Sequence, residues 1–178
     1  MKKNILFETD RCYVRPFQRE DFLGFSKLNG AQELMQYVTP DGKPRNIFQA
    51  KKKFDFIMEH QGRYSFSYWA VFKKSTNEFI GQAGMIYVSG MQIHLCFAFL
   101  KEFWGKGFAT EAVSGAIEYG FNKLNFYKII TIVRVENKPS IHILEDKLGF
   151  KNIGQSTIFS GFKVHDYEIT KEKYFGKS

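Results

Sequence analysis

The feature that most constrains the fold is a glycine-rich turn between a strand-like segment and an amphipathic helix. The turn reads Trp104-Gly105-Lys106-Gly107-Phe108-Ala109. Small residues at 105, 107 and 109 allow the backbone to approach a ligand closely and to adopt conformations that larger side chains disfavour. Successive N–H groups there, with the first-turn donors of the helix and the charge of Lys106, are suited to binding a diphosphate. A tight connection that binds nothing would have the same glycine spacing.

The hydrophobic pattern around this turn predicts one mixed α/β domain over residues 1–178. Apolar residues recur at helical spacing from Thr110 to Leu124, and Pro139 and Gly149 are placed to begin and end a later helix. A mostly antiparallel half precedes a β-α-β-α-β-β half. We expect strands at residues 12–17, 68–73, 79–88, 93–100, 128–135, 151–160 and 164–171, and helices at 20–28, 31–38, 48–60, 110–124 and 139–148.

Charge narrows the class of ligand. The formal net charge of +8 favours an anionic partner. We do not expect nucleic acid, because the basic residues are scattered and the densest run, residues 51–53, leads into a helix with one solvated face. A polyphosphate cofactor satisfies the same electrostatics with fewer assumptions.

The chain has no pattern typical of a membrane protein, a secreted protein or a metal site. No apolar run approaches the ~20 residues that a membrane helix needs, and the N-terminal segment does not resemble a signal peptide. Cys12 and Cys96 are the only cysteines, and they show neither metal-ligand spacing nor a disulfide framework. We therefore expect a cytoplasmic protein without a metal.

Several segments together resemble one family, the GNAT acetyltransferases. The turn resembles their acetyl-CoA motif, Q/R-x-x-G-x-G/A, with Trp104 in the Q/R place, as is common in the ribosomal-protein N-terminal acetyltransferase (RimJ/RimL-like) branch. The resemblance covers nearly the whole chain and implies a single domain whose mixed, mostly antiparallel sheet is splayed at the cofactor site and flanked by helices. The other matching segments, in order, are Arg15-Pro16-Phe17 with Asp21, Trp69-Ala70-Val71, Phe79-Ile80-Gly81, Glu136-Asn137-Lys138-Pro139-Ser140 and Leu144-Glu145-Asp146-Lys147-Leu148-Gly149-Phe150.

The resemblance implies acetyl-CoA as co-substrate and assigns residues to it. The strand end Phe97-Ala98-Phe99-Leu100 is expected to pair with the pantetheine arm, and an N–H near Ala98 or Phe99 to hold the thioester carbonyl. Trp104 and the loop after it are expected at the pyrophosphate. The loop residues expected to wrap it are Gly105, Lys106, Gly107, Phe108, Ala109 and Thr110.

Two further residues are assigned by the same resemblance. Asn137 would hydrogen-bond the pantetheine amides, and Ser140 would place a hydroxyl near the CoA sulfur, where the departing thiolate needs a proton. The family transfers the acetyl group directly within a ternary complex, so no nucleophilic Cys or Ser is required. A structural interpretation also exists, in which Asn137 ends a strand and Ser140 helps to cap the next helix.

The sequence departs from the family at the expected general base. Relatives commonly read E-I-G-Y where this chain reads His94-Leu95-Cys96-Phe97. The imidazole of His94 could replace the glutamate, with an inflection near pH 6 to 7, or His94 could be a packed or surface residue. His142 and His165 are weaker candidates for the base.

The sequence thus predicts transfer of an acetyl group from acetyl-CoA to a primary amine, either a protein N-terminus or a small molecule. The alternative is a non-catalytic domain that binds acyl-CoA or regulates a partner. Neither the acceptor nor the oligomeric state, monomer or homodimer, follows from the residues. We expect acceptor specificity to come from residues 33–48 and from the final hairpin.

Overall fold

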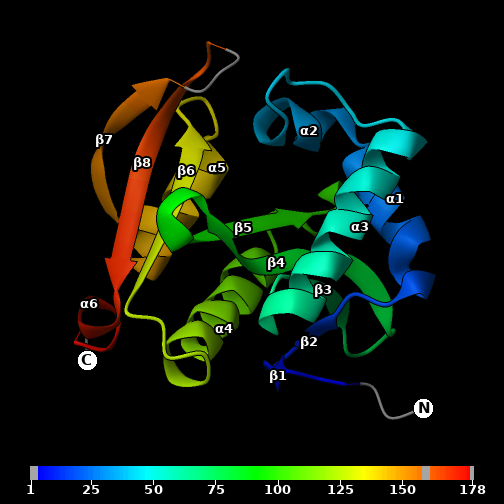
Figure 1. Ribbon diagram of the computed structural model, residues 1–178, viewed down its shortest axis with the longest axis horizontal. Coiled ribbons are helices and arrows are strands. Elements are labelled where there is room, and N and C mark those ends of the chain that lie inside the picture. The colour runs from blue at the N-terminus through cyan, green and yellow to red at the C-terminus, as the bar shows by residue number, and fades with distance from the viewer. Residues whose placement is uncertain (1–3, 158–160, 177–178) are drawn as a thin grey trace.

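The fold is built on one eight-stranded sheet with helices on both faces (Figure 1). The computed structural model describes residues 4–157 and 161–176. The strand order is β1-β2-β3-β4-β5-β6-β8-β7, and every neighbouring pair is antiparallel except β5 and β6. The strands are β1 (Phe7–Glu8), β2 (Cys12–Pro16), β3 (Tyr68–Lys73), β4 (Glu78–Val88), β5 (Gln92–Phe99), β6 (Lys128–Arg134), β7 (Lys151–Thr157) and β8 (Lys163–Thr170). This confirms the expected mixed sheet.

Two hydrophobic clusters cover the two faces of the sheet. On one face, buried Phe54 and Ile57 of α3 pack with Phe25 of α1 and with residues of β3. On the other, α4 buries side chains such as Val113 and Ile117 in the larger cluster. The helices are α1 (Phe22–Asn29), α2 (Gln32–Val38), α3 (Ile47–Tyr64), α4 (Phe108–Asn122), α5 (Lys138–His142), which continues as a π-helix (Ile143–Leu148), and α6 (Lys171–Phe175).

Strands β5 and β6 are the neighbours that separate. Their parallel register contains a single pair among the described residues, His94↔Ile130. Beyond that pair, β5 continues to Phe99 along β4, while β6 pairs with β8 on its other side. The sheet therefore has a gap next to the second half of β5, as the family resemblance implied.

The main differences from the predicted elements lie at their ends. Helix α4 begins at Phe108 rather than Thr110, because Gly107 takes the left-handed conformation (φ 81°) and closes the turn at once. Helix α3 extends to Tyr64 and starts with a capping box in which Asn46 accepts from the Gln49 N–H. Strand β7 ends at Thr157, so the last three residues of the predicted strand 151–160 lie outside the described residues.

One strand and one helix, β1 and α6, were not predicted. The short β1 pairs with β2. The terminal α6 begins where Thr170 caps it by accepting from the Lys173 N–H, which ends β8 one residue before the predicted limit at Lys171. Gly149 caps the π-helix as expected, with φ 75° and a bond from the Phe150 N–H to the Leu144 carbonyl. Within the described part of the chain, no helix has the length and apolar character that crossing a bilayer requires.

Candidate active site

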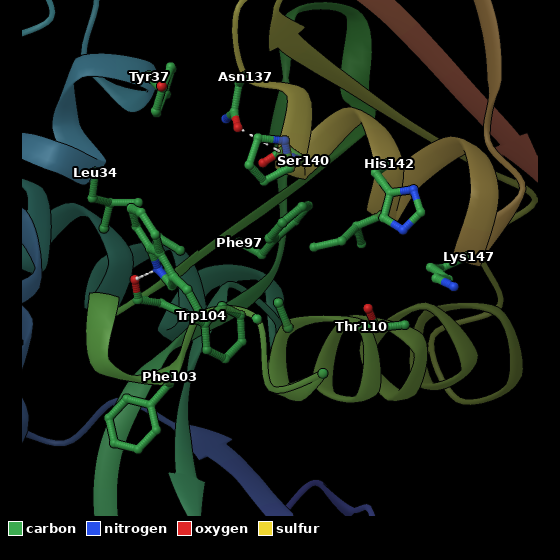
Figure 2. Close-up of a pocket in the computed structure, with 17 residues that line it drawn as sticks. Leu34, Tyr37, Phe97, Phe103, Trp104, Thr110, Asn137, Ser140, His142 and Lys147 are labelled. Atoms are coloured by element: carbon green, nitrogen blue, oxygen red, sulfur yellow. Dashed lines mark hydrogen bonds between the residues drawn. The ribbon is translucent and has the colours of Figure 1, made fainter.

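A cavity of about 410 Å³ lies beside the gap in the sheet (Figure 2). Its walls come from α2, the end of β5, the glycine-rich turn, the start of α4 and the α5 region. Ten of the residues assigned from the sequence line it: Phe97, Ala98, Phe99, Trp104, Gly105, Gly107, Ala109, Thr110, Asn137 and Ser140. The structure therefore brings the proposed cofactor and thiolate residues to one place.

The glycine-rich turn forms one end of this cavity. Gly105 and Gly107 have φ values of 69° and 81°, which L-residues rarely adopt. Gly107 is the N-cap of α4, and its own carbonyl accepts from the Glu111 N–H. The first N–H groups of α4 have no partners within the helix, so they are available to an anion.

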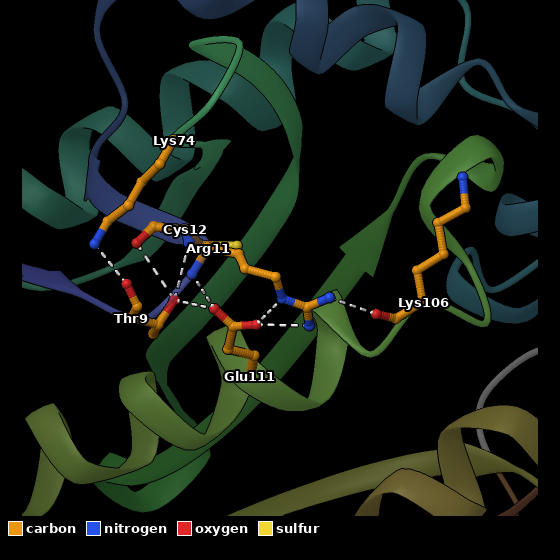
Figure 3. A network of polar contacts seen from close by, with 6 residues as sticks. All are labelled: Thr9, Arg11, Cys12, Lys74, Lys106 and Glu111. Atoms are coloured by element: carbon orange, nitrogen blue, oxygen red, sulfur yellow. Dashed lines mark hydrogen bonds and ion pairs between the residues drawn. The ribbon is translucent and has the colours of Figure 1, made fainter.

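A polar network holds this turn against the loop between β1 and β2 (Figure 3). Glu111, in the first turn of α4, accepts from the Arg11 Nε at 2.7 Å and the Arg11 backbone N–H at 2.7 Å. Thr9 adds a hydroxyl donor to Glu111 at 2.5 Å. Arg11 Nη1 donates to the Lys106 carbonyl at 2.9 Å, and its guanidinium lies 4.5 Å from the Phe108 ring centroid. The conformation of the turn is thus fixed from outside the cavity.

Three residues assigned to the cofactor do not line the cavity. Leu100 and Phe108 are buried members of the larger hydrophobic cluster. Lys106 donates its Nζ to the Glu102 carbonyl at 2.8 Å. For these residues a contact with the cofactor remains a prediction, and the geometry favours a role in shaping the turn.

The hydrogen-bonding pattern of β5 distinguishes between the two backbone N–H groups considered for the thioester carbonyl. Leu100 N donates to Ile80 O of β4, so the alternation of an antiparallel strand turns the Ala98 N–H toward β4 as well. The intervening residues face the gap. Accordingly, the Phe99 carbonyl accepts from Trp104 Nε1 at 2.6 Å, and the Leu95 carbonyl accepts from Thr131 of β6 at 3.0 Å.

It follows that the N–H groups of Phe97 and Phe99, rather than that of Ala98, are directed toward the open edge. Phe97 and Phe99 also line the cavity.

The start of α5 brings Asn137 and Ser140 together on the cavity wall. Asn137 is the N-cap, and its side-chain oxygen accepts from the Ser140 N–H at 3.3 Å. The cap is therefore the asparagine, and the interpretation of Ser140 as the helix cap was wrong. No hydrogen bond from the Ser140 hydroxyl to a described residue is found, which leaves this group available within the cavity.

His94 lies apart from the cavity. His94 lies opposite Ile86 of β4, and its side chain is on the sheet face that α3 covers. It does not line the cavity. Burial first, and then the nearby charge of Lys53, lower the pKa of His94 to about 4. Because the ring is desolvated, this lowered pKa does not favour the expected inflection near pH 6 to 7, and the pH profile of activity stays a prediction. A role as base remains a prediction.

The cavity also contains residues that sequence reasoning missed. Leu34 and Tyr37 come from α2, within the segment expected to govern acceptor choice, and Lys147 adds a cation from the π-helix. The weaker candidate His142 is at the wall too, with Nδ1 2.6 Å from Asp146 Oδ2. His165 instead lies on β8, opposite Gln155 of β7. Across the described residues there is no group of three or more His, Cys, Asp or Glu placed to hold a metal.

The architecture and the cavity agree with a match to a known family. The family described as Acetyltransferase (GNAT) domain matches residues 11–151. The chain belongs to the GNAT acetyltransferase family. It is therefore an acetyl-CoA-dependent N-acetyltransferase, and the alternative of a non-catalytic domain is not supported.

Individual relatives of this acetyltransferase cover most of its length. An uncharacterized N-acetyltransferase p20 of Bacillus licheniformis is 29% identical, over 94% of this chain and 97% of the relative. The spermidine N(1)-acetyltransferase of Escherichia coli is 30% identical over 80% of this chain and 74% of the relative. The structure of a Vibrio cholerae spermidine N-acetyltransferase in complex with CoA and spermine has a TM-score of 0.77 and 22% identity, covering 93% of this chain and 98% of that one.

Proposed function

We propose that this enzyme transfers the acetyl group of acetyl-CoA directly to a primary amine within a ternary complex. The observation that supports this most strongly is one cavity containing the glycine-rich turn, the open edge of β5 and the free Ser140 hydroxyl. The turn and the first N–H groups of α4 would bind the pyrophosphate. The N–H groups of Phe97 and Phe99 at the open edge would pair with the pantetheine arm and the thioester carbonyl.

The reaction itself requires one bond to form and one to break. The amine nitrogen attacks the thioester carbon, and the oxyanion that develops is stabilised by a backbone N–H of β5. The C–S bond then breaks, and the Ser140 hydroxyl gives a proton to the departing thiolate and regains one from water. The proton lost by the amine leaves through a base or through water. No covalent enzyme intermediate is needed, which is consistent with the burial that raises the pKa of Cys96 and keeps its thiol protonated.

The same proposal extends to the branch of the family and to the class of acceptor. Trp104 in the Q/R place and the segment from Glu136 to Ser140 support the RimJ/RimL-like branch. Trp104 also has a structural role, since its indole N–H bonds the Phe99 carbonyl beside the cavity. The spermidine acetyltransferases among the relatives make a polyamine the second candidate acceptor.

An acceptor screen that measures free CoA tests this function. Acetyl-CoA is mixed with the protein and with peptides of varied N-terminus, amino acids, polyamines and other small amines. Acetylation of an amine, seen as CoA release with a matching mass increase of 42 Da on the acceptor (about the mass of one acetyl group minus one hydrogen), supports the proposal. Release of CoA without an acetylated product, or none with any amine, would contradict it.

A further inference from the structure

A second set of polar side chains lies on the face of the sheet that α3 covers. The register places Gln82 opposite Ala98, and it places Cys96 opposite Gly84, which is itself opposite Tyr68. Because side chains alternate along a strand, Gln82, Cys96 and Tyr68 share this face. Lys53 extends from α3 toward this face, and its Nζ lies 5.1 Å from the Tyr68 ring centroid. Arg45 interacts electrostatically with Cys96, Tyr68 and Lys53, and with it these residues are called the α3-face cluster below.

This cluster is next to the reaction cavity. Ala98 lines the cavity, and Cys96 lies two residues earlier on the same strand face, roughly 7 Å away. Both residues follow the His94↔Ile130 pair, where β6 departs and the sheet is open. Arg45, Lys53 and Cys96 are half-buried, so each retains some access to solvent. An acceptor that reaches the thioester from the α3 side would meet this cluster.

The cluster contains two cations and no opposing carboxylate. Lys53 forms no ion pair and no hydrogen bond with any residue in the described ranges. Burial lowers the pKa of Lys53, so a bound anion would favour its charged form. Burial also raises the pKa values of Cys96 and Tyr68, so both are neutral and provide no negative charge.

The guanidinium of Arg45 is held in place through only one of its nitrogens, among the described residues. Its Nη1 donates to Asn29 Oδ1 at 2.9 Å and approaches Met35 Sδ at 3.3 Å. Nε and Nη2 have no partner among residues 4–157 and 161–176. Asp41 in the preceding loop is an acidic group that interacts with Arg45, and only over distance. A guanidinium held at one corner in this way offers the rest of its fork to a carboxylate or phosphate.

Gln82 supplies an independent sign of a missing ligand. Gln82 is 5% exposed, and its Oε1 has no hydrogen-bond partner among the described residues. Leaving a buried acceptor unpaired is costly, and such groups usually meet a ligand or water. An amide oxygen can only accept, so a ligand that pairs with it must carry an N–H or O–H; the Cys96 thiol, which interacts with the Gln82 side chain, is only a weak donor. A ligand that fits the cluster would therefore place an anionic group near Arg45 and Lys53 and a hydrogen-bond donor near Gln82.

We infer that the acetyl acceptor carries an anionic group, a carboxylate or a phosphate, near the amine that is acetylated, and that Arg45 and Lys53 bind this group. Gln82 Oε1 then accepts a hydrogen bond from an N–H of the acceptor. This inference rests on the proposed function. It separates the enzyme from the two spermidine acetyltransferases described above, because a polycation would be repelled by Arg45 and Lys53.

The test is a comparison of matched acceptors. Each amine in the panel is supplied as a carboxylate and as its carboxamide, or as a phosphate ester and as the corresponding alcohol, and spermidine represents cationic acceptors. The variants are Lys53→Gln and Arg45→Gln. Lys52→Gln is the control, because Lys52 is the exposed neighbour on the same helix. Acetyl-CoA affinity is measured by calorimetry for every variant, to confirm folding.

We expect kcat/KM to favour the acidic member of a pair by about 10-fold or more. Lys53→Gln and Arg45→Gln should each lose most of that ratio by slowing the acidic acceptor, with the neutral acceptor and acetyl-CoA affinity unchanged, and Lys52→Gln should keep it. Carboxylate and phosphate pairs distinguish the two anions. Better turnover of neutral amines or spermidine overturns the inference while leaving the proposed function intact. An acidic preference that survives both variants also overturns it. CoA release with no amine at all would overturn both.

Discussion

Arg11 and Glu111 lie 100 positions apart in the sequence, yet the Arg11 Nε is 2.7 Å from Glu111 Oε2. The pair joins the loop before β2 to the first turn of α4, and the same guanidinium reaches the Lys106 carbonyl. Burial alone would raise the pKa of Glu111, but hydrogen bonds from Thr9 and Arg11 outweigh it and lower the pKa. The glycine-rich turn is therefore positioned by residues that do not line the cavity.

Replacing Arg11 with Gln should weaken acetyl-CoA binding without removing a residue of the cavity wall. The carbonyl of Lys106 loses its donor, and the turn must be ordered when the ligand binds. We expect Kd for acetyl-CoA to rise about 3- to 10-fold, or ~1 kcal/mol, measured by calorimetry. Lys51→Gln is the control, because it breaks an exposed Lys51–Asp55 pair on α3 instead. Equal affinities in wild type and Arg11→Gln would show that the turn holds its shape alone.

Gly107→Glu should abolish acetyl-CoA binding. The residue has φ 81°, and a Cβ added there would lie 3.2 Å from Arg11 Nη2. A carboxylate would also bring negative charge to the N-terminus of α4, where the pyrophosphate is expected. Gly62→Glu is a matched control, since an added Cβ at that exposed position in α3 meets nothing within 4 Å. Unchanged affinity in Gly107→Glu would disprove the assignment of this turn.

Ser140→Ala should reduce kcat by about 10- to 1000-fold, equivalent to roughly 1.4 to 4 kcal/mol in the transition state. Acetyl-CoA affinity and melting temperature should hardly change, because Asn137 rather than Ser140 caps α5. Steady-state kinetics with any acceptor from the screen provides the measurement. A normal kcat with a lower melting temperature would instead identify a structural residue.

His94→Ala tests whether His94 accepts the amine proton. With a pKa of about 4, its imidazole is already neutral at pH 6, so kcat/KM should not fall through pH 6 to 7 on account of this residue. If His94 is the base, activity should fall in His94→Ala and recover in part in His94→Glu, the residue that relatives often have. A variant with the wild-type rate at every pH between 5 and 8 would show that His94 only packs.

The same residue should make stability depend on pH. A histidine whose folded pKa is lowered from 6.5 to about 4 binds fewer protons in the folded state than in the unfolded state. Stability is then complete above pH 6.5 and is lost as pH falls toward 4. We expect wild type to lose about 2 kcal/mol between pH 7.5 and pH 5 relative to His94→Gln. Urea unfolding of both proteins at the two pH values measures this difference, and parallel losses would refute it.

The sequence could predict what is local and repeated. Gly107 marked the turn, Gly149 marked the end of the helix after α5, and the apolar period of α4 was legible from Thr110 onward. These features depend on local backbone conformation and on the spacing of apolar residues along the helix, and both are determined by residues close together in the sequence. The splay of the sheet at the cofactor site was expected from the family resemblance rather than from the residues.

The sequence could not show what arises from register and distant contacts. Nothing near Arg11 indicates that it bonds Glu111, and nothing near Lys53 indicates that it lacks an ion pair among the described residues. Gln82 was passed over because an isolated glutamine in a strand pattern carries no signal. His94 illustrates the same limit, since its type favoured a near-neutral base and only the packing of α3 over the strand revealed a lowered pKa.

Because β5 and β6 separate, the second half of β5 in the free protein has an edge that pairs with no other described strand. Amide hydrogens of Phe97 and Phe99 at the open edge should exchange rapidly with solvent deuterium, while those turned toward β4 exchange slowly. An acyl donor that pairs with this edge takes the place of a neighbouring strand. Its binding should therefore stabilise the contact between the two halves of the sheet. By mass action, a donor at a hundred times its Kd adds about 2.7 kcal/mol to the folded state. The resistance of this enzyme to unfolding in a cell would then follow the supply of its own donor.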